Sequence, residues 1–176
     1  MDGGETIDLG GGATVSVHAL PGHTAGSVAY RIDGQGDVFV GDAVQVHGAA
    51  NGFPGYADPA AYRASLRYLR DELAPRRLYL GHPYRRADGT PYGVELDAAQ
   101  AREAIGQSLD AEAAVAEAAC LCAVRVDDGS PYAPFAAAAA RLGYTGDPTS
   151  EPAPFFTSLS GYHPHHPHHD DTGATP

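Results

Sequence analysis

Polar and apolar residues alternate along the first part of the chain. The clearest case is 14–20, in which Val15, Val17 and Ala19 are separated by polar side chains. A period of two is typical of a strand with one buried face. Turns rich in glycine separate this segment from similar ones, and the predicted strands are 6–9, 14–20, 27–32 and 37–40. Because successive strands joined by short turns pair as hairpins, we expect an antiparallel meander.

The pattern changes to a helical period after residue 58. Asp58 is a suitable N-cap, Pro59 suits the first turn, and Pro75 ends the helix. The apolar positions of this helix lie on one face, and they are Tyr62, Leu66, Leu69 and Leu73. A further strand is predicted at 76–80, directly after the helix.

A second helical region follows, from about residue 94 to 142. Asp97 with Gln100 predicts a capping box. The apolar positions after it continue on one face, and they are Ala101, Ile105 and Leu109. A break at 127–131 precedes a second predicted helix that contains 136–140. From Tyr144 onward the chain is rich in Pro, Ser, Thr and His without periodicity, which is typical of a disordered tail.

These elements predict a fold of the α/β class, with a mostly antiparallel sheet and flanking helices. We divide the chain into a sheet-bearing part at 1–92, a helical extension at 93–143 and a Pro/His-rich disordered tail at 144–176. A length of 176 residues is enough for one ordinary domain.

Charge and composition exclude several classes of partner. The formal net charge of -11 argues against binding to nucleic acid or to anionic membranes. No segment approaches the ~20 apolar residues of a membrane span, and the first residues do not resemble a signal peptide. We therefore expect a cytoplasmic protein with a small-molecule substrate. Cys120 and Cys122 stand two apart in a helical stretch, where they predict packing thiols and no disulfide.

Three polar residues follow predicted strands, each directly after a glycine. They are His23, Asp42 and His82. Glycine lets the backbone turn sharply at a strand end, so that the next side chain can point from the sheet edge into a cleft. Two imidazoles and a carboxylate make a familiar catalytic zinc set. The alternative is that His23 and His82 are hydrogen-bonded surface residues and that Asp42 is a turn residue.

The segments that carry these residues resemble a known family. Val17-His-Ala-Leu-Pro-Gly-His-Thr-Ala-Gly-Ser27, Val38-Phe-Val-Gly-Asp42 and Leu78-Tyr-Leu-Gly-His82 are similar to the carboxy-terminal half of a metallo-β-lactamase-fold hydrolase of the glyoxalase II-like branch. The resemblance implies a four-layer αββα sandwich, of which 1–92 would supply the carboxy-terminal half.

The resemblance also implies a site with two zinc ions and a bridging hydroxide nucleophile. His23 would ligate the first metal, and His82 would ligate the second. Asp42 would bridge both metals, which gives it a direct part in catalysis. Thr24 and Ser27 would support the loop that positions His23.

The chain departs from the family pattern at its start. The leading His-x-His-x-Asp-His motif is missing, and only 22 residues precede His23. The sequence therefore resembles a truncated gene, a mispredicted start or one half of a split protein. Each metal would retain too few ligands, so that the chain alone is expected to be weak or inactive. We also expect an exposed apolar patch, because one face of the sheet would lack its cover.

The resulting prediction is a zinc-dependent hydrolase that acts on a thioester, lactone or other ester by attack of a metal-bound hydroxide. Its partner would be a complementing amino-terminal half or a second copy of the chain. The alternative is a non-enzymatic protein that uses its tail for binding divalent metal or for interaction with a partner. The histidines of that tail are His163, His165, His166, His168 and His169.

Four other residues near the predicted site are weaker candidates. His18 lies on the polar face of its strand, where we expect it to be exposed. His47 follows Asp42 in an irregular loop and is a candidate substrate contact. Tyr84 and Arg85 follow His82 and are candidate pocket residues.

Overall fold

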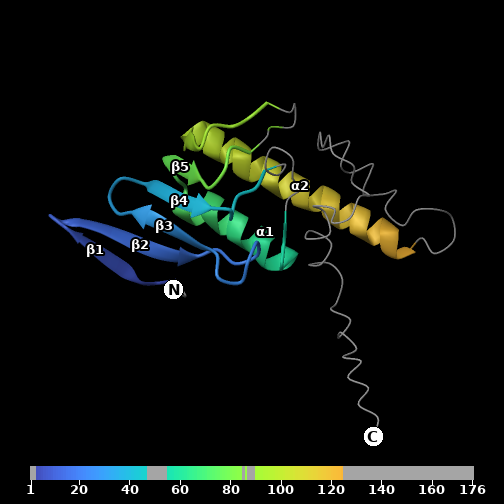
Figure 1. The fold of residues 1–176 in the computed structure, drawn as a ribbon, viewed down its shortest axis with the longest axis horizontal. Coiled ribbons are helices and arrows are strands. Elements are labelled where there is room, and N and C mark those ends of the chain that lie inside the picture. The colour runs from blue at the N-terminus through green and yellow to red at the C-terminus, as the bar shows by residue number, and fades with distance from the viewer. Residues whose placement is uncertain (1–2, 47–54, 85, 87–89, 125–176) are drawn as a thin grey trace, which may run out of the picture.

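The computed structural model describes residues 3–46, 55–84, 86 and 90–124, with side chains up to residue 117 (Figure 1). Its strands are β1 (Thr6–Gly10), β2 (Ala13–Ala19), β3 (Val28–Ile32), β4 (Asp37–Gly41), β5 (Arg77–Leu80) and β6 (Glu95–Asp97). Its helices are α1 (Pro59–Tyr68), the π-helical turn η1 (Leu69–Leu73) and α2 (Ala98–Val124). In this part of the chain, no helix has the length and apolar character needed to cross a membrane.

The strands form one six-stranded sheet in the order β1-β2-β3-β4-β5-β6. The first four pair antiparallel, which confirms the predicted meander. β5 lies parallel to β4 because the chain returns through α1 and η1 between them. The predicted α/β class with a mostly antiparallel sheet is therefore confirmed.

β6 was not predicted, since its residues fall in the region expected to be helical. Leu96 pairs with Leu78 of β5, and the strand has only three residues. So short a segment shows no alternation, and only pairing with β5 makes it a strand. β6 and α2 both follow the proposed boundary at residue 92, and both contact the sheet. The division at 92 stays a prediction.

The first helix begins as predicted and ends in a different geometry. Asp58 accepts a hydrogen bond from the backbone N–H of Ala61 at 2.9 Å, as an N-cap does. α-Helical geometry ends at Tyr68, and the five residues of η1 complete the predicted helix. The backbone N–H of Ala74 then donates to the carbonyl oxygen of Leu69 at 3.0 Å. Ala74 itself adopts a left-handed conformation with φ of 40°.

The capping box at the start of α2 is also confirmed. The carboxylate of Asp97 accepts hydrogen bonds from the backbone N–H groups of Ala99 and Gln100, both at 2.9 Å. The side chain of Gln100 accepts from the backbone N–H of Asp97 at 3.0 Å. The predicted second helix at 136–140 and the tail at 144–176 lie outside the described residues.

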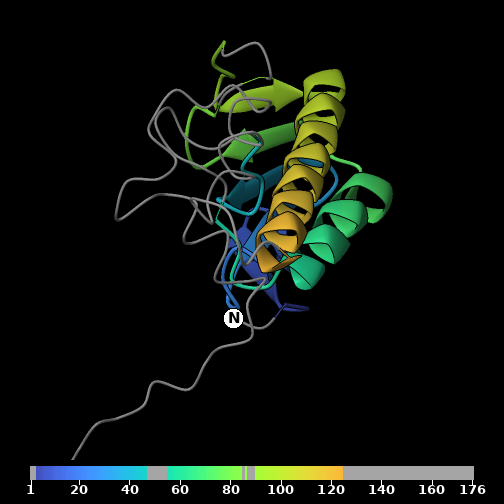
Figure 2. The ribbon, with the colours of Figure 1, turned by 90° about the vertical axis from the view of Figure 1, so that its right-hand side faces the viewer.

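Both helices cover the same face of the sheet (Figure 2). Val38, Leu78 and Leu96, from three neighbouring strands, are fully buried against Leu66 of α1 and Ile105 of α2. The described residues thus form two layers with one core between them.

The opposite face of the sheet is mixed. Val15 and Val17 on β2 are buried there, whereas Tyr30 on β3 and Phe39 on β4 are 37% and 40% exposed. The Phe39 ring stacks on Tyr79 of β5 with ring centroids 4.3 Å apart. Two partly exposed aromatic residues thus lie on this face beside a covered β2, and the apolar patch expected there stays a prediction.

Candidate metal centre

The three predicted ligands follow strands that end at the same edge of the sheet. β4 and β5 are parallel neighbours, so Asp42 and His82 emerge side by side just beyond their carboxyl ends. β2 runs in the same direction, because β3 is antiparallel to both β2 and β4. The loop that carries His23 therefore begins at this edge too.

The glycine before each predicted ligand has a separate physical reason. A Cβ at Gly22 would lie 2.3 Å from the backbone of Tyr62, because the His23 loop runs against α1. Gly41 has φ of +52°, a conformation that favours glycine. A Cβ at Gly81 would lie 2.6 Å from Oδ1 of Asp42. Glycine is thus required here by close approach at two positions and by backbone conformation at the third.

Asp42 and His82 are in direct contact. Nε2 of His82 lies 3.4 Å from Oδ1 of Asp42, and the two side chains are 57% and 39% exposed, respectively. The hydroxyl of Tyr84 donates a hydrogen bond to the same Oδ1 at 2.8 Å. Burial, and then the neighbouring carboxylate of Asp42, raise the pKa of Tyr84 above its usual range. The tyrosine therefore remains a hydrogen-bond donor at neutral pH.

His23 has a different set of contacts. Its Nδ1 lies 2.9 Å from the backbone carbonyl oxygen of Gly55 and 2.6 Å from the side-chain nitrogen of Gln45. The two contacts need opposite tautomers of His23. An unprotonated Nδ1 accepts from the Gln45 amide, whereas a protonated Nδ1 donates to Gly55 and leaves Nε2 as the nitrogen that can bind a metal. Gln45 is buried and also exchanges two hydrogen bonds with the backbone of Gly55.

The support predicted for the His23 loop is confirmed. The hydroxyl groups of Thr24 and Ser27 lie 2.9 Å apart, and the backbone N–H of Thr24 donates to the hydroxyl of Ser27 at 3.2 Å. The backbone N–H of Leu20 donates to the carbonyl of Ser27, which closes the loop at its base.

The donor set fits the geometry of zinc at one pair of residues. Two ligands of a tetrahedral zinc ion, each bound at ~2.0–2.2 Å, stand roughly 3.3 Å apart. The 3.4 Å between Asp42 and His82 fits two ligands of one ion. Among the residues that the structure describes, however, no three His, Cys, Asp or Glu side chains are grouped around a common point. The structure brings Asp42 and His82 into contact, whereas His23 is not grouped with them. Metal binding by the three residues stays a prediction.

The sequence patterns did not predict the contact of Gln45 with His23 or the contact of Tyr84 with Asp42. Gln45 was not singled out, although a polar residue inside the apolar run at 43–46 is a signal of a buried hydrogen-bonding role. Tyr84 was expected to line a pocket, and it instead contacts Asp42. His47 and Arg85 lie outside the described residues.

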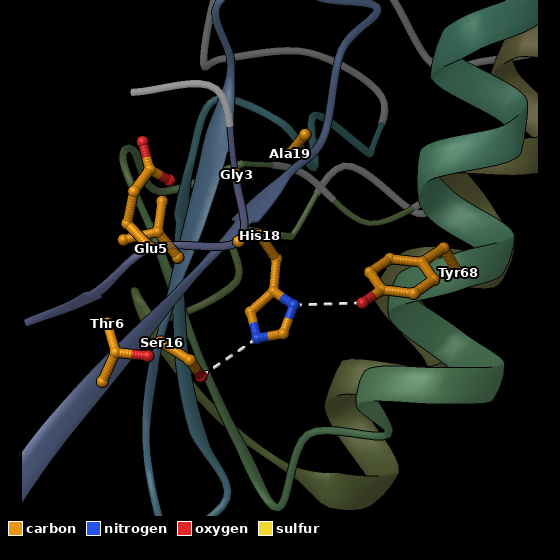
Figure 3. Close-up of a pocket in the computed structure, with 9 residues that line it drawn as sticks. Gly3, Glu5, Thr6, Ser16, His18, Ala19 and Tyr68 are labelled. Atoms are coloured by element: carbon orange, nitrogen blue, oxygen red, sulfur yellow. Dashed lines mark hydrogen bonds between the residues drawn. The ribbon is translucent and has the colours of Figure 1, made fainter.

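A separate pocket of about 530 Å³ lies between the amino-terminal segment, β2 and the end of α1 (Figure 3). His18 points into this space and lies 3.0 Å from the hydroxyl of Tyr68 through Nδ1 and 3.0 Å from the hydroxyl of Ser16 through Nε2. His18 was expected to be exposed and is instead half-buried, with its ring hydrogen-bonded to Tyr68 of α1.

Sequence comparison identifies the family that this edge of the sheet resembles. Residues 1–82 match the model of the metallo-beta-lactamase superfamily. That span contains all three predicted ligands and their glycines, and the resemblance inferred from the sequence is thereby confirmed. We refer to residues 1–82 as the metallo-beta-lactamase segment.

Curated relatives place this segment near one branch of the superfamily. A hydroxyacylglutathione hydrolase of Hyphomonas neptunium is 38% identical over 97 residues, which cover 55% of this chain and 36% of the relative. Another, of Acidiphilium cryptum, is 44% identical over 82 residues, which cover 46% of this chain and 32% of the relative. The chain thus spans about a third of the length of these curated relatives.

A solved structure supports the fold. A metallo-beta-lactamase family protein of Thermus thermophilus superposes with a TM-score of 0.57 at 20% sequence identity. The match covers 91% of this chain and 47% of that protein. At this identity, the likeness shows a shared fold and leaves activity to be argued from the site.

Proposed function

We propose that the edge of the sheet beyond β4 and β5 is part of the metal site of a hydrolase that acts on a thioester, lactone or other ester, with zinc as its metal. The observation that carries the proposal is the contact of Asp42 with His82 at 3.4 Å, inside the metallo-beta-lactamase segment. The hydroxyacylglutathione hydrolases that match this segment support a thioester as the substrate.

The residues have separate roles in this proposal. Asp42 and His82 would hold the ion, and His23 would supply a further imidazole from its loop. In zinc hydrolases, the ion lowers the pKa of water to ~7 and polarises the carbonyl that is attacked. Because the carboxylate of Asp42 is anionic, it also offsets the charge of a divalent ion at this edge. Among the described residues, only two proposed ligands, Asp42 and His82, are in contact. Because two ligands hold an ion weakly, we expect this chain alone to hydrolyse esters slowly.

The first experiment measures zinc affinity in the full chain. The tail histidines are replaced by asparagine at 163, 165, 166, 168 and 169, so that only the proposed site remains to be tested. In this background, Asp42→Asn keeps the size of the side chain and removes its charge. We expect a loss of zinc affinity of at least about tenfold, measured by competition with a chromophoric chelator.

The matched control is Asp71→Asn, because Asp71 is an exposed carboxylate paired with Arg70 on η1. This variant should bind zinc as the parent protein does. Equal affinity of the Asp42 and Asp71 variants would overturn the proposed site. If tight zinc binding disappears when the tail histidines alone are replaced, the result favours the alternative function, a non-enzymatic metal-binding protein.

The remaining proposals rest on sequence arguments. We infer a small-molecule substrate from the strongly negative charge, and a cytoplasmic location stays a proposal. A complementing amino-terminal half or a second copy of the chain remains the proposed macromolecular partner. The exposed Tyr30 and Phe39 on the open face of the sheet support such a partner.

A further inference from the structure

We propose that Tyr84 is a positioning residue that holds the carboxylate of Asp42 in the orientation needed for metal binding. The inference rests on the proposed function, because it concerns the same site. It assigns to Tyr84 a role that acts through Asp42 and requires no contact between the tyrosine and the substrate.

The contact between the two side chains is direct and sheltered. The Tyr84 hydroxyl donates to Oδ1 of Asp42 at 2.8 Å, and the tyrosine is only 2% exposed. Asp42 itself is 39% exposed on its side chain, so that solvent alone would leave its carboxylate free to rotate. A hydrogen bond from a buried, rigid donor removes that freedom before an ion arrives.

The position of Tyr84 is fixed by its own backbone. Its carbonyl oxygen accepts a hydrogen bond from the N–H of Tyr92 at 2.7 Å. Its ring also meets the ring of His82 edge-on, with centroids 6.1 Å apart and an interplanar angle of 80°. Tyr84 therefore contacts both members of the Asp42–His82 pair.

Gly81 leaves room for the same carboxylate oxygen. A Cβ at this position would lie 2.6 Å from the same Oδ1 that accepts from Tyr84. The absence of a side chain at residue 81 leaves the space that Oδ1 occupies, and the hydroxyl of Tyr84 holds the oxygen in that space. Two independent features thus select one orientation of the Asp42 side chain.

The test compares zinc affinities in the full chain that carries the asparagine substitutions in its tail. Tyr84→Phe removes only the donor and keeps the ring. We expect zinc affinity to fall by about tenfold to a hundredfold, as it does when hydrogen-bond partners of metal ligands are removed. Gly81→Ala is the second variant, and it should also weaken binding, because the new Cβ would lie 2.6 Å from Oδ1 of Asp42 and 3.0 Å from the backbone of Gly41.

The matched control is Tyr92→Phe, which removes a hydroxyl from another buried tyrosine close in the fold. Its zinc affinity should equal that of the parent chain. Thermal unfolding of the zinc-free proteins separates a folding defect from a positioning role. A positioning role predicts that a variant loses zinc affinity even where its unfolding temperature stays close to that of the parent chain. If Tyr84→Phe fails to fold, Gly81→Ala decides the question.

The outcomes separate this inference from the function on which it rests. If Asp42→Asn weakens zinc binding while Tyr84→Phe and Gly81→Ala bind as the parent does, the positioning role is wrong and the site remains. If Asp42→Asn itself has no effect, both the site and the positioning role are overturned. Losses in all three variants, with an unchanged Tyr92→Phe, support both.

Discussion

His18 illustrates how a network of hydrogen bonds sets the protonation of a side chain. Hydrogen bonds from Thr14 and Ser16 lower the pKa of Asp33, so this residue is an ionised acceptor near neutral pH. Ser16 donates to Asp33, and its oxygen is then available to accept from Nε2–H of His18. Nδ1 of the histidine consequently accepts from the hydroxyl of Tyr68. The network is satisfied by a neutral imidazole.

The pH dependence of stability follows from the pKa of His18. Burial of the ring, and then the charge of Arg31, lower this pKa below 6.5, although Asp33 acts in the opposite direction. As the pH falls below ~6.5, the unfolded chain takes up the proton before the folded chain does, so that folding loses stability. We expect urea midpoints to fall more between pH 7.5 and 5.5 in the parent protein than in His18→Gln. Parallel profiles would contradict this account.

At the scale of elements, the His23 loop and the start of α1 form one unit. The carbonyl oxygen of Gly22 accepts hydrogen bonds from the backbone N–H groups of Ala57 and Asp58, at 2.8 and 2.9 Å. Asp58 then caps α1. The position of the loop that bears His23 therefore depends on the first turn of a helix more than thirty residues later in the chain.

Substitution of Gly22 should disrupt this unit. In Gly22→Ala the new Cβ would meet the backbone of Tyr62 at 2.3 Å, at a φ of +137° that alanine rarely adopts. We expect a loss of about 2–4 kcal/mol in the free energy of unfolding, from steric overlap and backbone strain together. Chemical denaturation measures it.

Gly26→Ala is the control for that prediction. Gly26 lies in the same loop, and a Cβ there would meet nothing within 4 Å. Its free energy of unfolding should stay within about 0.5 kcal/mol of the parent value. Equal effects of the two substitutions would show that the approach of the loop to α1 does not matter for stability.

At the scale of the whole molecule, one core joins the sheet to the helices. Leu78 is at its centre, fully buried and paired with Val38 on one side and with Leu96 on the other. In the sequence, Val38 lies about forty positions before Leu78, and Leu96 lies about eighteen positions after it. The stability of the metallo-beta-lactamase segment therefore depends on β6, which lies beyond residue 82.

Truncation of Leu78 tests this dependence. Leu78→Ala should lower the free energy of unfolding by about 2–5 kcal/mol, through lost burial and the cavity that remains. Leu9→Ala removes the same atoms from a side chain that is 62% exposed, and its effect should be within about 0.5 kcal/mol. Comparable losses in guanidinium denaturation would be inconsistent with a core centred on β5.

Local sequence patterns were sufficient for the elements whose signals are contained within a few residues. The alternation at Val15 and Val17 predicted β2, and Asp58 with Pro59 predicted the start of α1. The glycines before His23, Asp42 and His82 were found in the same way, because strand ends and turns depend on neighbouring residues. These signals work at short range since backbone conformation and capping are local interactions.

Other features depend on residues that meet only after folding. β6 is a strand because β5 lies beside it, and Gln45 contacts His23 across a gap of 22 positions in the chain. The tertiary structure also brings Asp42 to His82 and Tyr84, while His23 forms its contacts with Gly55 and Gln45. Sequence spacing could not distinguish these arrangements, because distances between side chains on different strands are set by sheet order, register and packing, none of which is encoded in any single short segment.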